Sequence, residues 1–207
     1  MATKKTPLKL SFEPFAPVII SLVGLSLLFC ILKFFSHTPS FAVYFSAPSC
    51  PGTKTAFNYQ NPIEYLRFFL HIFGSRTFTD ACVTFLILLL LGIQVEQQFG
   101  SLFTFIIVVV STIVTAVVNA CFIKSPCSGL ECIVWCIFLL TAFPPENRKN
   151  LSVPLLFALS ILAVKDINLI INEKDFTMIS EIAGGFCGSL VSLAVSSPKS
   201  RSKKTAS

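Results

Sequence analysis

The sequence predicts an all-α, polytopic membrane protein, built as a bundle of six transmembrane helices. Of its 207 residues, 54% are hydrophobic and only 13% are charged, whereas about a quarter of the residues in a soluble domain are charged. Phenylalanine alone occupies 22 positions, and a globule of this size cannot bury so much apolar surface. This composition excludes a soluble globule, a disordered chain and a nucleic-acid-binding protein with an exposed basic face.

The first predicted span covers Ala16–Phe35 and follows a basic tail at residues 1–15. The next segment, residues 36–77, holds four prolines, several charges and several aromatic side chains. It is too polar to cross a membrane and too apolar to be a free linker. We therefore expect a structured first loop embedded in the membrane interface, where aromatic side chains are favoured.

The other predicted spans are the apolar stretches Phe78–Gln94, Leu102–Phe122, Gly129–Phe143, Leu151–Val164 and Thr177–Val195. The fifth is short, because Lys165 and Asp166 interrupt it. We expect a short helix there that leads into a half-buried loop, not a full crossing. The membrane domain then covers residues 16–195, and a second basic tail covers residues 196–207.

The formal net charge of +6 comes mostly from basic residues that lie outside the predicted spans. They gather in both tails and, as Arg148 and Lys149, in the loop before the fifth span. Basic residues flank membrane spans on the cytoplasmic side, so we expect both termini to be cytoplasmic, in a plasma or inner membrane. The tails would contact anionic lipid headgroups, and we expect no nucleic-acid partner.

Most of the eight cysteines lie in or beside apolar segments, where a thiol packs like a small hydrophobic group. Cys132 and Cys136 share one helix face, but no histidine accompanies them as a further ligand. We therefore expect neither a metal site nor a cofactor.

Four acidic residues lie inside or at the edge of predicted spans, and ionisable groups at membrane depth face the bundle interior because lipid exposure is costly. They are Asp80, Glu96, Glu131 and Glu181. The sixth span also carries a pair of glycines four residues apart, Gly184 and Gly188. Such a pair lets a second helix approach closely, and here the contact would begin one turn from Glu181.

In order along the chain, residues from about Arg67 to Gly188 resemble the rhomboid family of intramembrane serine proteases. Arg67 and His71 resemble the Arg-x-x-x-His motif of the family's membrane-embedded first loop. Gly92 and Glu96 resemble its Gly-x-x-x-Glu motif in the second span. The resemblance implies that these residues hold the loop and the second span in place, and that the fold is a rhomboid-like six-helix bundle.

The family's nucleophile motif, Gly-x-Ser-Gly, is similar to residues 126–129, with Ser128 and Gly129 kept. Its last motif, His-x-x-Gly-x-x-x-Gly, is similar to Glu181 followed by Gly184 and Gly188. The resemblance thus implies that Ser128 stands at the nucleophile position, whereas Glu181 replaces the histidine base. The glycines at these positions are expected to be packing contacts.

Two further replacements fall where the family holds the oxyanion: Asp80 and Thr84 stand at its His and Asn positions. A carboxylate with a pKa of about 4.3 is a poor base for a serine hydroxyl. A negative charge on Asp80 would oppose the charge that develops in the transition state. We therefore expect conventional rhomboid proteolysis to be impaired.

By the same resemblance, Asp80 and Glu181 should converge on Ser128, with Glu131 one helical turn below. Neighbouring acids in a medium of low dielectric cannot all ionise. We expect them to share protons, or to bind a cation or a basic residue of a client protein.

Three functions remain open. The leading hypothesis is a catalytically impaired pseudoprotease that binds transmembrane segments of client proteins laterally, near the second and fifth spans. The first alternative is an active intramembrane serine endopeptidase that uses Ser128 with a non-standard base. The second alternative is a proton- or cation-handling membrane protein that uses Asp80, Glu131 and Glu181.

Overall fold

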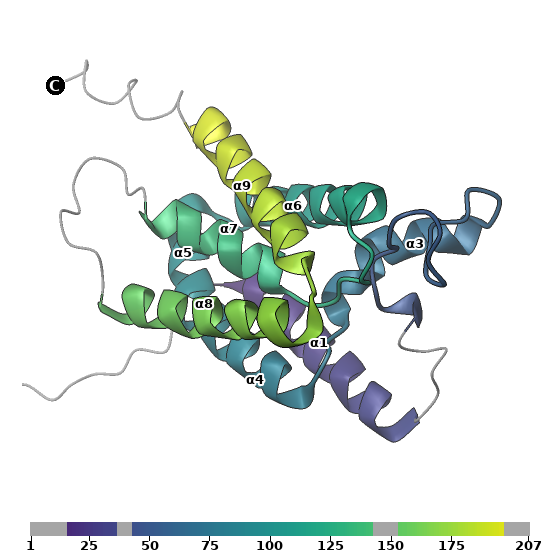
Figure 1. Cartoon of the computed structure of the whole chain (residues 1–207). Coiled ribbons are helices and arrows are strands. Elements are labelled where there is room, and N and C mark those ends of the chain that lie inside the picture. The colour runs from purple at the N-terminus through teal and green to yellow at the C-terminus, as the bar shows by residue number, and fades with distance from the viewer. Residues whose placement is uncertain (1–15, 37–42, 143–152, 197–207) are drawn as a thin grey trace, which may run out of the picture.

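The computed structural model describes residues 16–36, 43–142 and 153–196, and these are predominantly helical (Figure 1). Each of the six predicted apolar stretches contains helix. The basic tails and the loop with Arg148 and Lys149 lie outside the described residues. The elements are α1 (Pro17–Ser36), α3 (Pro62–Leu70), the 3₁₀-helix η1 (His71–Phe73), α4 (Phe78–Ile87), the π-helix η2 (Leu88–Gly92), α5 (Ile93–Phe99), α6 (Ser101–Phe122), α7 (Glu131–Ala142), α8 (Val153–Glu173) and α9 (Thr177–Ser196).

Two helical stretches of the described chain are long and apolar enough to cross a membrane. One is α4, η2 and α5 taken together, which run without a break over Phe78–Phe99, and the other is α6. Gly100, with a φ of +90°, joins them. This backbone conformation is accessible to glycine without steric cost, so the two stretches turn sharply at that residue.

The prediction for the fifth span was wrong. α8 does not stop at Val164 but continues as regular helix to Glu173. Lys165 pairs with Glu131 inside the bundle, and Asp166 is only 3% exposed. Because both polar side chains lie on the inner side of the helix, they are compatible with a continuous helix.

The helix α9 packs most closely against α6 and α7, lying alongside both in Figure 1. A Cβ atom on Gly184 would lie 1.9 Å from Thr115 Oγ1, and one on Gly188 would lie 2.0 Å from Ser111 Oγ. Neither distance is compatible with a side chain, so glycine is required for this approach of α9 to α6. Van der Waals packing between small residues is a main source of helix association in lipid.

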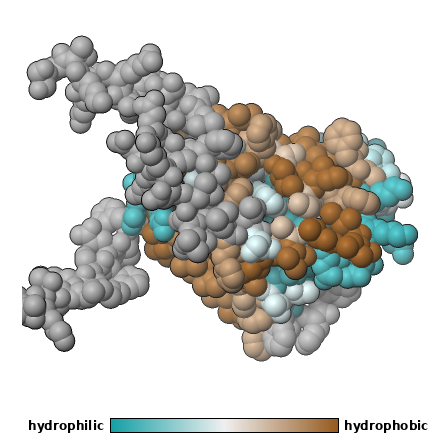
Figure 2. Space-filling view, turned by 60° about the vertical axis from the view of Figure 1, so that its left-hand side comes forward, coloured by the Kyte–Doolittle hydropathy of each residue, from teal (hydrophilic) through white to brown (hydrophobic). Residues whose placement is uncertain are grey.

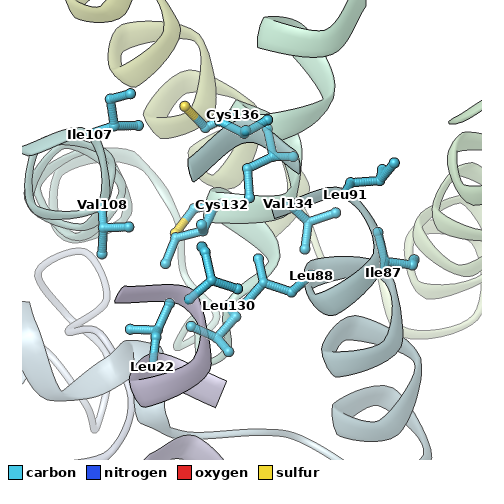
Figure 3. Close-up of a cluster of buried hydrophobic side chains, with 14 of the residues drawn as sticks. Leu22, Ile87, Leu88, Leu91, Ile107, Val108, Leu130, Cys132, Val134 and Cys136 are labelled. Atoms are coloured by element: carbon cyan, nitrogen blue, oxygen red, sulfur yellow. The ribbon is translucent and has the colours of Figure 1, made fainter. Parts of the chain in front are cut away.

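The hydrophobic core lies where α1, α4, η2, α6 and α7 meet (Figure 3). Leu22, Leu88 and Leu130 are among its buried side chains. Gly92 faces this core, because a Cβ there would lie 3.1 Å from Ile19 Cδ1. The second predicted span is thereby packed against the first.

The outer surface of the bundle is strongly apolar (Figure 2). Leu102 and Phe122, at the two ends of α6, are 78% and 77% exposed. A monomeric soluble protein rarely exposes such large contiguous apolar surface, whereas a lipid bilayer solvates it.

The predicted first loop is ordered in its described part, residues 43–77. Buried Arg67 donates hydrogen bonds to Ser46 O (3.1 Å) and Thr55 O (3.4 Å) and pairs with Glu64 (2.5 Å). Asn119 of α6 donates to Pro48 O (2.9 Å). The segment is therefore attached to the bundle through buried polar contacts; its position relative to a membrane stays a prediction.

Candidate functional site

The loop between α6 and α7 carries Ser128 and is held by backbone hydrogen bonds. Ala47 N donates to Cys127 O (2.6 Å), and Gly129 N donates to His71 O (2.9 Å). Gly129 has a φ of +128°, a conformation that favours glycine. Gly74 lets the end of η1 approach the loop, because a Cβ there would lie 3.0 Å from Ser128 Cβ.

Ser128 lines an open cavity of about 410 Å³. Its other lining residues include the side chains of Lys33 and Arg76 and the hydroxyls of Ser46 and Ser125. Within the described parts of the chain, the Ser128 hydroxyl makes no hydrogen bond. Ser128 therefore lies at an open cavity, and within the described residues no base makes a hydrogen bond to its hydroxyl.

Glu181, at the start of α9, contacts the residue before Ser128. Its Oε1 accepts a hydrogen bond from Cys127 Sγ at 3.3 Å, and Glu181 itself is buried. The hydrogen-bond contact of Glu181 is thus with Cys127, the neighbour of Ser128; the convergence of Glu181 on Ser128 itself stays a prediction. Cys127 points inward, next to Ala47 and Ala116, whereas Ser128 lines the open cavity.

Burial raises the pKa of the Cys127 thiol well above its usual value, and the charges of Glu181 and Glu131 raise it further. The thiol is therefore protonated at neutral pH, which suits a hydrogen-bond donor to Glu181. It is not the reactive thiolate that nucleophilic catalysis needs.

Asp80 also makes no hydrogen bond to Ser128 within the described residues. Thr77 caps α4 by accepting a hydrogen bond from Asp80 N (3.1 Å) and donates its hydroxyl to Asp80 Oδ2 (2.6 Å). Asp80 Oδ1 lies 3.7 Å from Lys165 Nζ. Thr84, one turn further along α4, is buried, and both residues line a narrow pocket with Gly129 and Glu131.

Lys165 is the central cation of the site. Its ammonium pairs with Glu131, the first residue of α7, and reaches Asp80 of α4. We call Asp80, Glu131, Asp166 and Glu181, together with Lys165, the acid cluster. Sequence reasoning took Lys165 and Asp166 as helix breakers. The rule that ionisable residues at membrane depth face the bundle interior would have placed them here.

Arg76 forms the second cationic contact beside the acid cluster. It pairs with Asp175 and donates to Thr177 Oγ1, while Asp175 Oδ1 accepts the Thr177 N–H at the start of α9 (3.0 Å). Burial alone would lower the pKa of Arg76, but the charges of Asp175 and Glu181 outweigh it, so the pKa lies above its usual value. Arg76 therefore stays charged and ties the chain before α4 to α9.

His71 is fully buried in η1, and its Nδ1 lies 3.1 Å from Phe68 O. Burial lowers the pKa of His71 to about 4, despite hydrogen bonds from the ring to backbone carbonyls, which raise it. Nε2 has no hydrogen-bond partner among the described residues. The ring is thus neutral at physiological pH and makes no hydrogen bond to Ser128 within the described residues; the backbone carbonyl of His71 supports the Ser128 loop.

Glu96 of α5 has a different role from these groups. Its two carboxylate oxygens accept the backbone N–H groups of Val18 (3.0 Å) and Ile19 (2.9 Å) at the start of α1. A helix start leaves its first N–H groups without intrahelical partners. Glu96 supplies these partners from another helix and so joins α5 to α1.

Comparison with known proteins bears on these residues as a set. A family model described as the Rhomboid domain matches residues 62–198, about two thirds of the chain, from α3 through α9. No curated protein matches the chain. The matched region contains Ser128, Glu181 and the acid cluster.

Proposed function

The chain belongs to the rhomboid family, and we propose that it is a non-proteolytic member that binds transmembrane segments of client membrane proteins. A rhomboid domain implies a polytopic membrane protein. One observation supports the proposal: Glu181, which the resemblance assigns to the position of the family's catalytic histidine, accepts a hydrogen bond from Cys127, while no base makes a hydrogen bond to the Ser128 hydroxyl within the described residues. Within the described residues, Glu181 is thus hydrogen-bonded to Cys127 and not to Ser128.

The chemistry of the replacements supports the same reading. General-base catalysis needs a group within hydrogen-bond reach of the hydroxyl proton, and the described residues place none there. The oxyanion position holds Asp80, an acid, next to Lys165. Losing one oxyanion donor costs about 10² to 10³ in rate, so losing the donors and the base together leaves little catalysis.

The features that remain are those that shape a membrane-embedded binding surface. Arg67 anchors the first loop, and Gly184 and Gly188 hold α9 against α6. We propose six membrane crossings with both termini in the cytoplasm and the basic tails on anionic lipid. Clients would approach laterally, beside α4 and α8.

The test is capture of clients by photocrosslinking in native membranes, comparing the wild-type chain with Ser128→Ala. We expect the same single-pass membrane proteins to be enriched by both, because binding does not use the hydroxyl. Cleaved client fragments that depend on Ser128, or no enriched membrane protein under any condition, would overturn the proposal.

An intramembrane serine endopeptidase is the second candidate, and the 410 Å³ cavity beside Ser128 favours it. A rearrangement of the 126–129 loop would be needed to bring a base to the hydroxyl. Labelling by a serine-directed fluorophosphonate decides between the two. Labelling that Ser128→Ala abolishes would establish an activated serine, whereas we expect the wild-type chain to remain unlabelled.

A further inference from the structure

The acid cluster carries more carboxyl groups than cations. Arg76 pairs with Asp175 and lines the same cavity as Asp166 and Glu181. Together with Lys165 it gives two cations for five carboxyl groups within the described residues, which are Asp80, Glu131, Asp166, Asp175 and Glu181. Lys165 contacts Glu131 and Asp80. The remaining two acids, Asp166 and Glu181, line one narrow cavity and have no contact to Lys165 that neutralises them directly.

Asp166 provides an independent sign of a missing partner. It is 3% exposed, and its Oδ2 has no hydrogen-bond donor in the described part of the chain. Leaving a buried carboxyl oxygen unpaired costs free energy. A hydrogen-bond donor from a bound partner would remove this cost.

The acid cluster lies near the lipid-facing side of the bundle. The side chains of Asp80 and Lys165 are 23% and 17% exposed, and they join α4 to α8, two helices that lie on the same side of the bundle in Figure 1. The outer side of α8 is exposed and apolar, as shown by the exposed residues Phe157, Val164 and Ile171.

We infer that the acid cluster binds a lysine or arginine side chain in a client's transmembrane segment, between Asp166 and Glu181. This inference rests on the proposed function and names its client class. A basic side chain costs about 2.5–3.5 kcal/mol at the centre of a lipid-exposed helix, and pairing with buried acids removes much of that cost. An ammonium or guanidinium group would donate to Asp166 Oδ2 and offset the excess negative charge. Clients with an all-apolar segment gain nothing from this site.

The experiment uses the full chain in phospholipid nanodiscs and three synthetic single-pass helices. The helices are leucine-rich and carry a benzophenone next to one central position, which is Lys, Leu or Glu. We expect crosslinking of the Lys helix to exceed that of the Leu helix by about tenfold, as for one favourable charge contact. Crosslinking of the Glu helix should fall below both.

Variants then assign the preference to the acid cluster. Asp166→Asn and Glu181→Gln should each reduce capture of the Lys helix to the level of the Leu helix. Lys165→Met, which removes the internal cation, should raise it. Ser160→Ala, on α8 but outside the cluster, is the control and should leave the preference unchanged, because the Ser160 hydroxyl is exposed and donates only to Phe157 O of its own helix. Because Asp166→Asn and Glu181→Gln are both isosteric, the test still stands if one of the two variants misfolds.

The outcomes separate the inference from the function on which it rests. Equal capture of the Lys and Leu helices would overturn the inference and leave client binding standing. Capture of none of the three helices would overturn both. A preference for Lys that survives both Asp166→Asn and Glu181→Gln would place the recognition elsewhere and also overturn the inference.

Discussion

Two buried glutamates of this chain have opposite surroundings. Glu96 accepts two backbone N–H groups at the start of α1, so its charge has well-defined hydrogen-bond partners. Glu181 accepts only a thiol hydrogen bond within the described residues and faces further acids in the acid cluster. A buried charge with good donors stabilises a fold, whereas one without them costs free energy. The comparison supports a structural role for Glu96 and agrees with the binding role that we propose for Glu181.

Removal of Glu96 is the strongest way to test the comparison. In Glu96→Ala, the N–H groups of Val18 and Ile19 lose their partners where α1 meets α5. Hydrogen bonds to a charged group are worth about 1.5–3 kcal/mol each, so we expect a loss of about 4 kcal/mol in the free energy of unfolding. Chemical unfolding in detergent micelles measures it. A loss below about 1 kcal/mol would remove Glu96 from its structural role.

Acidification should act through His71, whose folded pKa of about 4 lies below its ordinary value of 6.5. Between these values the unfolded chain binds a proton that the folded chain does not, so stability falls as pH drops from 6.5 to 4. The full difference is about 3 kcal/mol. Unfolding measured against pH in wild type and His71→Gln isolates this contribution; identical slopes would contradict it.

Lys165→Met should destabilise the acid cluster without touching Glu96. Glu131 and Asp80 would lose their cation, and breaking a partly buried pair from one side leaves an uncompensated charge. We expect a loss of about 2 kcal/mol, read as a lower midpoint of thermal unfolding. Adding Glu131→Gln should recover part of it, and a double variant no more stable than the single one would speak against the pair.

Glu181→Gln should have the smallest effect. An amide oxygen can still accept the hydrogen bond from the Cys127 thiol. The substitution also removes one negative charge from a cluster in which carboxyl groups outnumber cations. We expect a change within about 1 kcal/mol, in the stabilising direction. The same thermal-unfolding measurement checks it. A loss as large as that of Glu96→Ala would mean that the two glutamates do not differ in kind.

Much of the fold was predictable because its signals are local. Apolar stretches of sufficient length located the helices, and the spacing of Gly184 and Gly188 located a close helix contact that the glycine distances to Thr115 and Ser111 bear out. The failure at α8 has a physical cause. Charged residues in an apolar stretch oppose a membrane crossing when they face lipid, but Lys165 instead pairs with Glu131 and lies near Asp80 inside the bundle.

The site was less predictable than the fold. Ser128 and Glu181 were found by motif, but motif spacing gives a position along each chain segment and not the direction of a side chain. In the loop before α7, a step of one residue changes the contact from Ser128 to Cys127. Arg76 carried no motif at all, and its pairing with Asp175 becomes visible only when α4 and α9 are placed together.

By itself, the sequence determined that this chain belongs in a lipid bilayer, where its helices run and which glycines allow them to approach. Those properties follow from hydropathy and spacing within single segments. Only the tertiary structure decided which carboxylate meets which donor. Lys165 donates to Glu131, 34 residues away, and Cys127 donates to Glu181, 54 residues away. Such pairs depend on how whole helices rotate and slide against one another. That arrangement is set by the packing of all of them together.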